Sequence, residues 1–434
     1  MFWPKRIGEL NRGTGVVQKL SLNLIDMVKG ISECVDLVNP AFSKHHAKVA
    51  YIALNIAQSM NLPLDEKRDL VIASLLHDVG ALSTEERLQY LAFEADFEFN
   101  NPHGHAATGH HLFKQFEPFF GPALLIKHHH TYYRDMERNT VPSGACILQL
   151  ADRVAVLAKS GDEIPVREIE SKVYAQRTRM FHPDVVDVFL DISQSAHFWP
   201  GMERVPLDVL VEENGLDTTV DMDLEELRSF ASILHVIIDF RSRFTAWHSC
   251  GVAGVAVELA RHFGFSEESL KLMEIAGNLH DLGKVAIPIE ILEKPDTLTE
   301  EEFTLVKSHA YYTYRVLQQI KDLETITIWG SFHHEKLDGS GYPFSLKGED
   351  LPLGSRIMAV SDIFSALTED RPYRSGLSVS DALGYIKGLV GDDKIDKNVF
   401  SVLEAESDYI VEKLSSIKEE SIKRFDAFYS DVEV

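Results

Sequence analysis

Asn278-Leu-His-Asp-Leu-Gly-Lys284 places an adjacent histidine and aspartate at the end of Leu270 to Leu279, an apolar stretch with helical spacing. A lone His309 follows, and then the run His333-His-Glu-Lys-Leu-Asp-Gly-Ser-Gly-Tyr-Pro343. Imidazole and carboxylate groups bind hard or borderline divalent metal ions. Because neighbouring residues of a helix point about 100° apart, the aspartate could bridge two ions while the histidine binds one. This stretch therefore predicts a metal centre carried by helices.

Helical spacing extends through most of the 434 residues. It is clear in Leu20 to Ile31, in Ala47-Lys-Val-Ala-Tyr-Ile-Ala-Leu-Asn-Ile-Ala-Gln-Ser-Met60 and in Leu70-Val-Ile-Ala-Ser-Leu-Leu-His-Asp-Val-Gly80. The alternating β-branched pattern that is typical of strands is scarce. The chain is therefore predicted to be all-α.

The metal-binding pattern occurs twice in the same order, which indicates two copies of one domain. In both copies, 32 residues separate the first histidine from the His-Asp pair, and 24 residues separate the lone histidine from the histidine pair. The first copy contains His45, His77, Asp78, His105, His129, His130 and Asp152; the second contains His248, His280, Asp281, His309, His333, His334 and Asp362.

We predict a first domain at residues 1–200, a linker at 201–222 and a second domain at 223–434. The linker mixes proline, glycine and acidic residues. An amphipathic helix from Leu224 to Phe240 leads into the second domain, and its apolar face could join the two domains or form the seam of a homodimer.

The composition excludes several partners. The net charge of −24 argues against binding of DNA, extended RNA or anionic membranes, which depends on many Lys and Arg contacts. No apolar run is long enough to span a bilayer, and the start lacks the apolar stretch of a signal peptide, so we expect a cytoplasmic protein. Cys34, Cys146 and Cys250 are scattered and suggest no disulfide framework or zinc ribbon.

The second copy resembles the HD-GYP phosphodiesterases, a branch of the HD phosphohydrolase superfamily, over residues 240–405. The resemblance rests on His280-Asp281 with Gly283-Lys284, on His309, on His333-His-Glu-x-x-Asp-Gly-x-Gly-Tyr-Pro343, and on Arg356 to Arg374. It implies a metal-dependent hydrolase that converts a cyclic dinucleotide, with cyclic di-GMP as the first expectation, to the linear 5′-phosphorylated dinucleotide. Two alternatives stay open: 3′3′-cyclic GMP-AMP as the substrate, and a non-enzymatic sensor of cyclic dinucleotide or metal.

The resemblance also implies roles for single residues. Asp281 and Lys284 are expected to be catalytic, with Lys284 holding the scissile phosphate as a point charge. Arg371 and Arg374 are candidates for the second phosphate or for a solvated ion-paired face. The implied metal ligands are His248, His280, Asp281, His309, His333, His334 and Asp362.

Relatives with a third metal carry a glutamate four residues before the position of His248, where this chain has Phe244. We therefore expect two divalent ions, Fe or Mn first, with Ni, Zn or Mg as alternatives. Such a pair can activate water and stabilise the entering and leaving oxygens of a phosphoryl displacement.

The segment from Asp338 to Pro343 is predicted to be a loop that binds substrate. Gly339 and Gly341 permit positive φ and a close approach of backbone to ligand, and Pro343 stiffens the exit. Tyr342 offers a flat ring on which a base could stack.

The first copy keeps the ligand pattern but has Ala81 at the lysine position and Thr131-Tyr-Tyr-Arg-Asp135 in place of the loop. Three interpretations remain. The first domain could be a regulatory or dimerisation module that keeps its metal. It could be a phosphohydrolase with another substrate, such as a 5′-nucleotidase acting on the linear product. Its histidines could also be buried polar groups without a metal.

Overall fold

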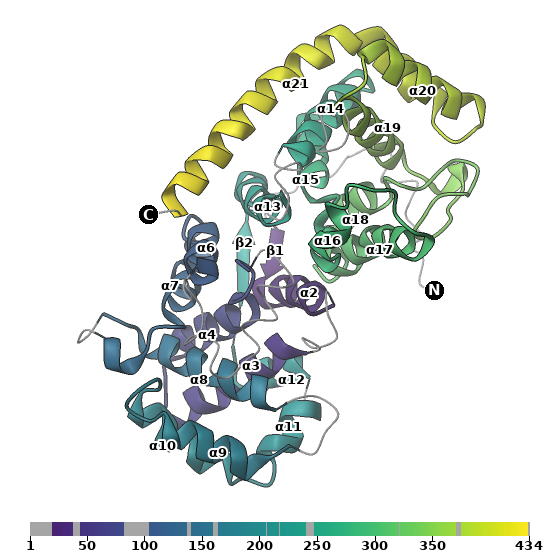
Figure 1. The fold of residues 1–434 in the computed structure, drawn as a ribbon. Helices are drawn as coiled ribbons and strands as arrows, with labels where there is room; N and C mark the ends of the chain where they lie inside the picture. The colour runs from purple at the N-terminus through teal and green to yellow at the C-terminus, as the bar shows by residue number, and fades with distance from the viewer. Residues whose placement is uncertain are drawn as a thin grey trace. The chain divides into compact units, whose positions relative to one another are not determined.

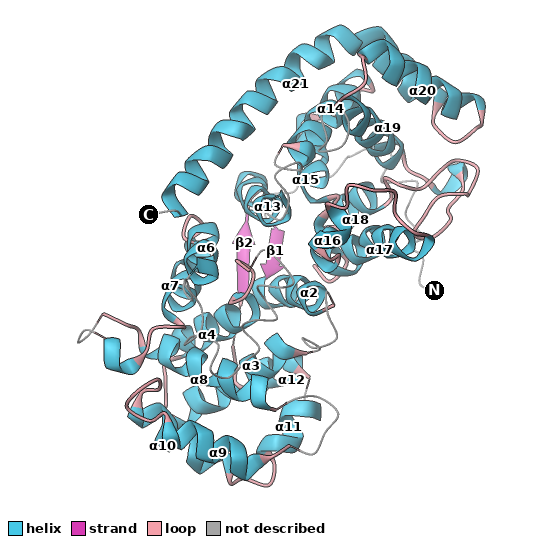
Figure 2. Cartoon of the chain, in the orientation of Figure 1, coloured by secondary structure: helices cyan, strands magenta, loops and turns pink. Residues whose placement is uncertain are grey.

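The computed structural model describes residues 20–37, 44–81, 104–136, 140–158, 164–204, 206–216, 218–239, 247–320, 322–369 and 375–432. Helices form most of these residues, which confirms the all-α prediction (Figures 1 and 2). The exception among the described residues is a two-stranded sheet of β1 (Leu20–Asn23) and β2 (Thr219–Met222). Phe244, Arg371 and Arg374 lie outside the described residues, so their predicted roles stay predictions.

The helix predicted from Leu20 begins later than its apolar spacing suggested. Residues Leu20–Asn23 pair as β1, and helix α2 (Leu24–Asp36) starts only after Asn23. The Asn23 side chain accepts hydrogen bonds from the backbone N–H groups of Ile25, at 3.0 Å, and Asp26, at 3.2 Å. Asparagine is a strong N-cap residue, so it fixes the helix start at this position.

The chain divides into two compact units, Asn23–Thr219 and Val220–Val434, the latter together with residues 20–22. Residues 207–213, inside the predicted linker, form helix α12 (Leu207–Glu213) in the first unit. Leu207, Leu210 and Val211 are buried and the helix packs against α3 (His45–Ser59), because apolar side chains at helical spacing need a surface to cover them.

In the first unit, α3 packs against two helices that also pack against each other, and a further pair of helices completes the metal-binding part. These four are α4 (Leu64–Leu76), α8 (Ser143–Leu157), α6 (Gly104–Phe113) and α7 (Phe120–His128). The remaining elements are η3 (Glu117–Phe119), η4 (Tyr133–Asp135), α9 (Val166–Ala175), α10 (Pro183–Ser193) and α11 (Phe198–Arg204).

The second unit repeats this arrangement. Helix α14 (His248–His262) packs against α15 (Glu267–Leu279) and α19 (Leu353–Thr368) as α3 packs against α4 and α8, and α17 (Glu300–Leu317) packs against α18 (Glu324–Ser331) as α6 packs against α7. The internal repeat in the sequence therefore corresponds to a repeated five-helix packing. The other elements are α13 (Leu224–Asp239), η5 (Leu282–Ala286), α16 (Ile289–Leu292), η6 (Gly348–Asp350), α20 (Val379–Gly391) and α21 (Lys397–Val432).

A glycine after each His-Asp pair sets how closely the next helix approaches. A methyl group on Gly283 would lie 2.0 Å from the carbonyl oxygen of His309 and 2.6 Å from the amide nitrogen of Thr313. A methyl group on Gly80 would lie 2.1 Å from the carbonyl oxygen of His105. In both domains the lone histidine can therefore approach the His-Asp pair only if this residue has no side chain.

We predict that Gly283→Ala lowers the free energy of unfolding by about 1–3 kcal/mol, because backbone must move to admit the methyl group. Urea denaturation measures this loss. Gly388→Ala, in α20, is the matched control, since nothing lies within 4 Å of its new methyl group. Equal stability of the Gly283 variant and the wild type would show that the close approach is not a constraint.

Candidate metal centres

The second domain brings all seven predicted metal ligands together from five helices. His248 begins α14, His280 and Asp281 directly follow α15, His309 lies in α17, His333 and His334 follow α18, and Asp362 lies in α19. The side chains are buried except that of His334, which is 27% exposed. Ligand atoms of His248, His280 and Asp281 lie within 4.8 Å of one another, as do those of His309, His333 and His334.

Two carboxylates join these histidine groups. Asp281 Oδ2 lies 3.2 Å from His280 Nε2, and Asp281 Oδ1 lies 3.3 Å from His309 Nε2. Asp362 Oδ1 lies 3.3 Å from His248 Nε2, and Asp362 Oδ2 lies 3.7 Å from His334 Nδ1. Each carboxylate therefore presents one oxygen to each group. For Asp281, the aspartate of the His-Asp pair, this is the placement that bridging of two ions would need.

Hydrogen bonds from Nδ1 orient the histidine rings. Nδ1 of His280, His309 and His333 lies 2.6–2.7 Å from the backbone carbonyl oxygen three residues earlier. Because a carbonyl can only accept, each Nδ1 carries a proton, and in the neutral ring the lone pair then lies on Nε2, where a ligand can bind. Partners of this kind are usual for metal-binding histidines.

His248 is oriented by a carboxylate instead. Its Nδ1 lies 2.9 Å and 3.1 Å from the two oxygens of Glu369, which is buried. Burial opposes protonation of His248, but the charges of Glu369 and Asp362 raise its pKa to about 10. Sequence reasoning missed Glu369, since no spacing rule links it to His248 across 121 positions.

The donor set fits a divalent metal. The Nε2 atom of His280 is buried and has no hydrogen-bond partner, which is rare for a polar atom unless an ion or water satisfies it. Burial opposes ionisation of Asp281, yet His280 and Lys284 hold its pKa well below the usual range. Burial and the charge of His334 lower the pKa of His333, so the ring is neutral and able to bind metal.

The predicted substrate-binding residues that the structure describes are Lys284, beside Asp281, and the loop from Asp338 to Pro343. Lys284 donates a hydrogen bond to Asp281 Oδ2 at 2.5 Å, and its side chain is 18% exposed. The Tyr342 ring lies beside the histidines, with its centroid 4.7 Å from that of His334. Asp338 instead serves the loop itself, since its Oδ1 accepts hydrogen bonds from the backbone N–H and the hydroxyl of Ser340.

Two further residues contact the loop. Glu335 belongs to the motif but had no predicted role, and Lys307 was not singled out in the sequence. Glu335 is buried and accepts hydrogen bonds from the backbone N–H groups of Phe344, at 2.6 Å, and Leu346, at 2.9 Å. Lys307 Nζ lies 6.0 Å from the centroid of the Tyr342 ring. The tight path past Glu335 needs Gly341, because a methyl group there would lie 2.4–2.6 Å from backbone atoms and Cα of residues 334–336. Gly339 has the positive φ of 82° that was predicted for this loop, and Pro343 follows Tyr342.

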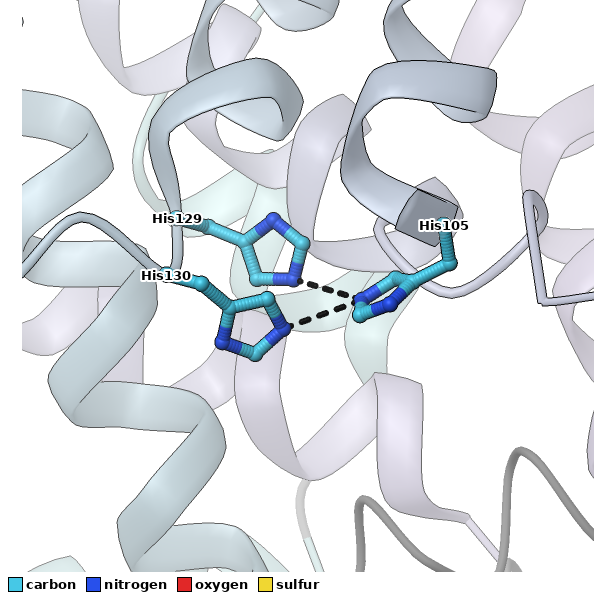
Figure 3. A group of neighbouring side chains, drawn as sticks. All are labelled: His105, His129 and His130. Atoms are coloured by element: carbon cyan, nitrogen blue, oxygen red, sulfur yellow. Dashed lines mark hydrogen bonds between the residues drawn. The ribbon is translucent and has the colours of Figure 1, made fainter. Parts of the chain in front are cut away.

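The first domain forms the corresponding pair of groups. His45 Nε2 lies 3.2 Å from Asp152 Oδ1, and His77 Nε2 lies 3.4 Å from Asp78 Oδ2. His105 Nε2 faces the Nε2 atoms of His129, at 3.3 Å, and His130, at 3.0 Å (Figure 3). Asp78 Oδ1 lies 3.7 Å from His105 Nε2, so this carboxylate also faces both groups.

Backbone carbonyls also orient the histidine rings of the first domain. His77 and His129 make the same Nδ1 contacts as His280 and His333, to the carbonyl oxygens of residues 74 and 126. Burial and then the charge of His130 lower the pKa of His105 to about 3, so this ring is neutral. The buried Nε2 atom of His77, like that of His280, has no hydrogen-bond partner.

Models of known families match both domains. A model described as HD domain matches residues 42–157, and a second one, also described as HD domain, matches residues 232–399.

The chain is a tandem HD-domain protein.

Relatives with two different reported activities match this tandem HD-domain protein. The 3′3′-cGAMP-specific phosphodiesterase 1 of Vibrio cholerae is 29% identical over 88% of the chain and 91% of its own length. The 3′3′-cGAMP-specific phosphodiesterase 3 of the same organism is 24% identical over 92% of the chain and 98% of its own length. A cyclic di-GMP phosphodiesterase response regulator of Xanthomonas campestris is 39% identical, but over 42% of the chain and 49% of its own length.

A crystal structure of a cyclic GMP-AMP specific phosphodiesterase of V. cholerae has the same fold. It matches with a TM-score of 0.62 and 20% identity, and the match covers 90% of this chain and 98% of that one. The resemblance to HD-GYP phosphodiesterases that was drawn from the motifs is thus confirmed. Within the part of the chain that the structure describes, none of the helices is long and apolar enough to cross a membrane.

We predict that Glu369→Gln weakens metal binding to the second domain about 10–100-fold, because His248 loses the negative charge that orients its ring. Calorimetric titration with Mn²⁺ measures this affinity. Glu412→Gln, at an exposed position of α21, should leave the affinity unchanged. Wild-type affinity in the Glu369 variant would contradict a positioning role for this residue.

Proposed function

We propose that the second HD domain is a metal-dependent phosphodiesterase that hydrolyses a cyclic dinucleotide to the linear 5′-phosphorylated dinucleotide. The observation that carries this proposal is the pair of carboxylates, Asp281 and Asp362, each facing two groups of oriented histidines. The names of relatives that match nearly the whole chain support the substrate class.

The seven ligands would hold two divalent ions, and such ions supply activation of water and stabilisation of charge on the phosphate. In the hydrolysis, the oxygen of water forms a new bond to phosphorus, the bond from phosphorus to the 3′ oxygen breaks, and the 3′ oxygen takes up a proton. The phosphate then remains on the 5′ oxygen of the linear product. Fe or Mn remains our expectation for the ions, since imidazole and carboxylate ligands suit both.

The chain's own side chains position the substrate. Lys284 is held by Asp281 but partly exposed, so its ammonium group can donate to an oxygen of the scissile phosphate. The Tyr342 ring, beside His334 and fixed through the Glu335 contacts of its loop, offers a surface on which a base can stack. Histidine rings whose Nδ1 groups are fixed by backbone carbonyls need no reorientation when ligands bind.

Two cyclic dinucleotides are candidate substrates. Cyclic di-GMP follows from the resemblance of the second domain to HD-GYP enzymes, and the matching cyclic di-GMP phosphodiesterase covers 42% of the chain. The two relatives that match nearly the whole chain carry the name 3′3′-cGAMP-specific. We therefore propose 3′3′-cyclic GMP-AMP as the preferred substrate and cyclic di-GMP as the second.

We predict that the full-length protein with Mn²⁺ or Fe²⁺ converts these cyclic dinucleotides to linear products that chromatography resolves. Asp281→Asn should abolish turnover, and Lys284→Ala should lower kcat about 10²–10³-fold, because one preorganised donor to the phosphate is lost. Lys387→Ala, at an exposed position of α20, is the control with wild-type rates.

Two results would contradict this proposal. Binding of cyclic dinucleotide without turnover would favour the sensor interpretation. Turnover that survives Asp281→Asn would exclude the metal mechanism.

The first domain has a second candidate function, removal of the 5′ phosphate from the linear product. The specific observation is that both of its metal-binding groups are formed while the loop that selects cyclic dinucleotides is replaced by residues 131–135. A cyclic dinucleotide has no terminal phosphate, whereas its hydrolysis product has one. A regulatory domain that keeps its metal, and the homodimer, also stay predictions.

We predict that the full-length protein releases inorganic phosphate from a linear 5′-phosphorylated dinucleotide, and that Asp78→Asn abolishes this release while opening of the cyclic substrate continues. The reason is that Asp78 belongs to the first domain, where it faces both histidine groups. A phosphate assay and chromatography follow the two reactions separately. Release that persists in Asp78→Asn but disappears in Asp281→Asn would assign the reaction to the second domain instead.

A further inference from the structure

In each domain a cationic side chain donates to a buried carboxylate, but the carboxylate differs between the two domains. In the second domain Lys284 donates to Asp281, the aspartate of the His-Asp pair. In the first domain that lysine is Ala81, and Arg153 instead donates to Asp152, the last ligand of the pattern. The residue that follows Asp362 in the second domain is Ile363.

Arg153 occupies the oxygen that would face the second histidine group. In the second domain Asp362 Oδ2 faces His334 Nδ1 at 3.7 Å. In the first domain Asp152 Oδ2 accepts hydrogen bonds from Arg153 Nε, at 3.0 Å, and Nη2, at 2.5 Å. Both side chains are almost fully buried, at 2% and 3% exposure. Breaking such a pair leaves a buried charge uncompensated, so this oxygen stays bound to the guanidinium.

Asp152 Oδ2, held by Arg153, is therefore not available to the group formed by His105, His129 and His130, whereas Asp362 Oδ2 faces the corresponding group of the second domain. The three Nε2 atoms of the first-domain group converge (Figure 3), and among the described residues an oxygen of Asp78 faces it. Imidazole ligands suit Zn and Ni, whereas carboxylates suit Mn and Mg. Arg153 also adds a fixed positive charge to this site, and a like charge disfavours a weakly bound cation.

We propose that Arg153 determines the metal selectivity of the first domain. The group of His105, His129 and His130 binds ions that prefer imidazole, such as Zn²⁺, and rejects Mn²⁺, whereas the group of His309, His333 and His334 accepts both. This inference rests on the proposed function in one respect, namely that the histidine groups hold metal.

Equilibrium dialysis of the full-length protein against Mn²⁺ or Zn²⁺, followed by elemental analysis, tests the proposal. Arg153→Ile introduces the residue of the second domain, and Arg153→Met fills more of the arginine volume if the isoleucine variant fails to fold. We expect either variant to bind about one more Mn²⁺ ion per chain than the wild type, with unchanged binding of Zn²⁺. Arg153→Lys keeps the charge and should bind as the wild type does.

The extra ion must also be assigned to its site. Adding His105→Ala to Arg153→Met should remove the gained Mn²⁺, while His309→Ala should leave the gain in place. Equal Mn²⁺ binding by the wild type and both apolar variants, or a gain that survives His105→Ala, would overturn the proposal for Arg153. A wild type that binds neither ion would instead refute the metal centres on which the proposed function depends.

Discussion

Each domain depends on an aspartate whose two oxygens face two groups of histidines. A buried carboxylate is costly unless opposite charge and hydrogen-bond donors surround it. Asp281 meets this requirement with imidazoles on both sides and with Lys284 at its outer edge. The residue lies just after the helix that ends at Leu279, and its two oxygens contact histidines from different helices. The five-helix packing is then the scaffold that brings His248 and His309, from two other helices, to the same carboxylate.

The backbone next to this aspartate limits what the sequence can be. Gly283 and Gly80 occupy the same position in the two domains, and in both a side chain would collide with the carbonyl oxygen of the lone histidine. The close approach that brings the predicted metal ligands together therefore requires glycine two residues after each aspartate. The helix ends agree as well, since His280 has φ −57° and ψ −32° and His77 has φ −57° and ψ −33°. The two domains therefore share the backbone conformation at the His-Asp pair, the predicted ligands and the glycine that follows, as expected for two copies of one domain.

Sequence reasoning found the residues whose spacing repeats and missed the roles of residues whose contacts follow no repeated spacing. The seven ligands of each domain could be predicted because helical packing imposes equal intervals on both copies. The roles of Glu369 and Arg153 could not, since their contacts follow no interval that both domains share, and Glu335 stood in the motif without a predicted role. The strand β1 was also missed, because four residues are too few to show alternation and their partner lies about 200 positions away.

The comparison of the two domains separates holding metal from choosing a substrate. Both domains keep the oriented histidines and a carboxylate that faces both histidine groups, so these features alone do not distinguish the two domains. What differs is the position of the fixed cation and the loop beside the histidine pair. Lys284 is partly exposed and can reach a phosphate, whereas Arg153 is buried and donates to Asp152. Moving the cation from one carboxylate to the other therefore changes its possible role from contacting substrate to tuning the metal site, which is consistent with two domains that handle successive states of one phosphate ester.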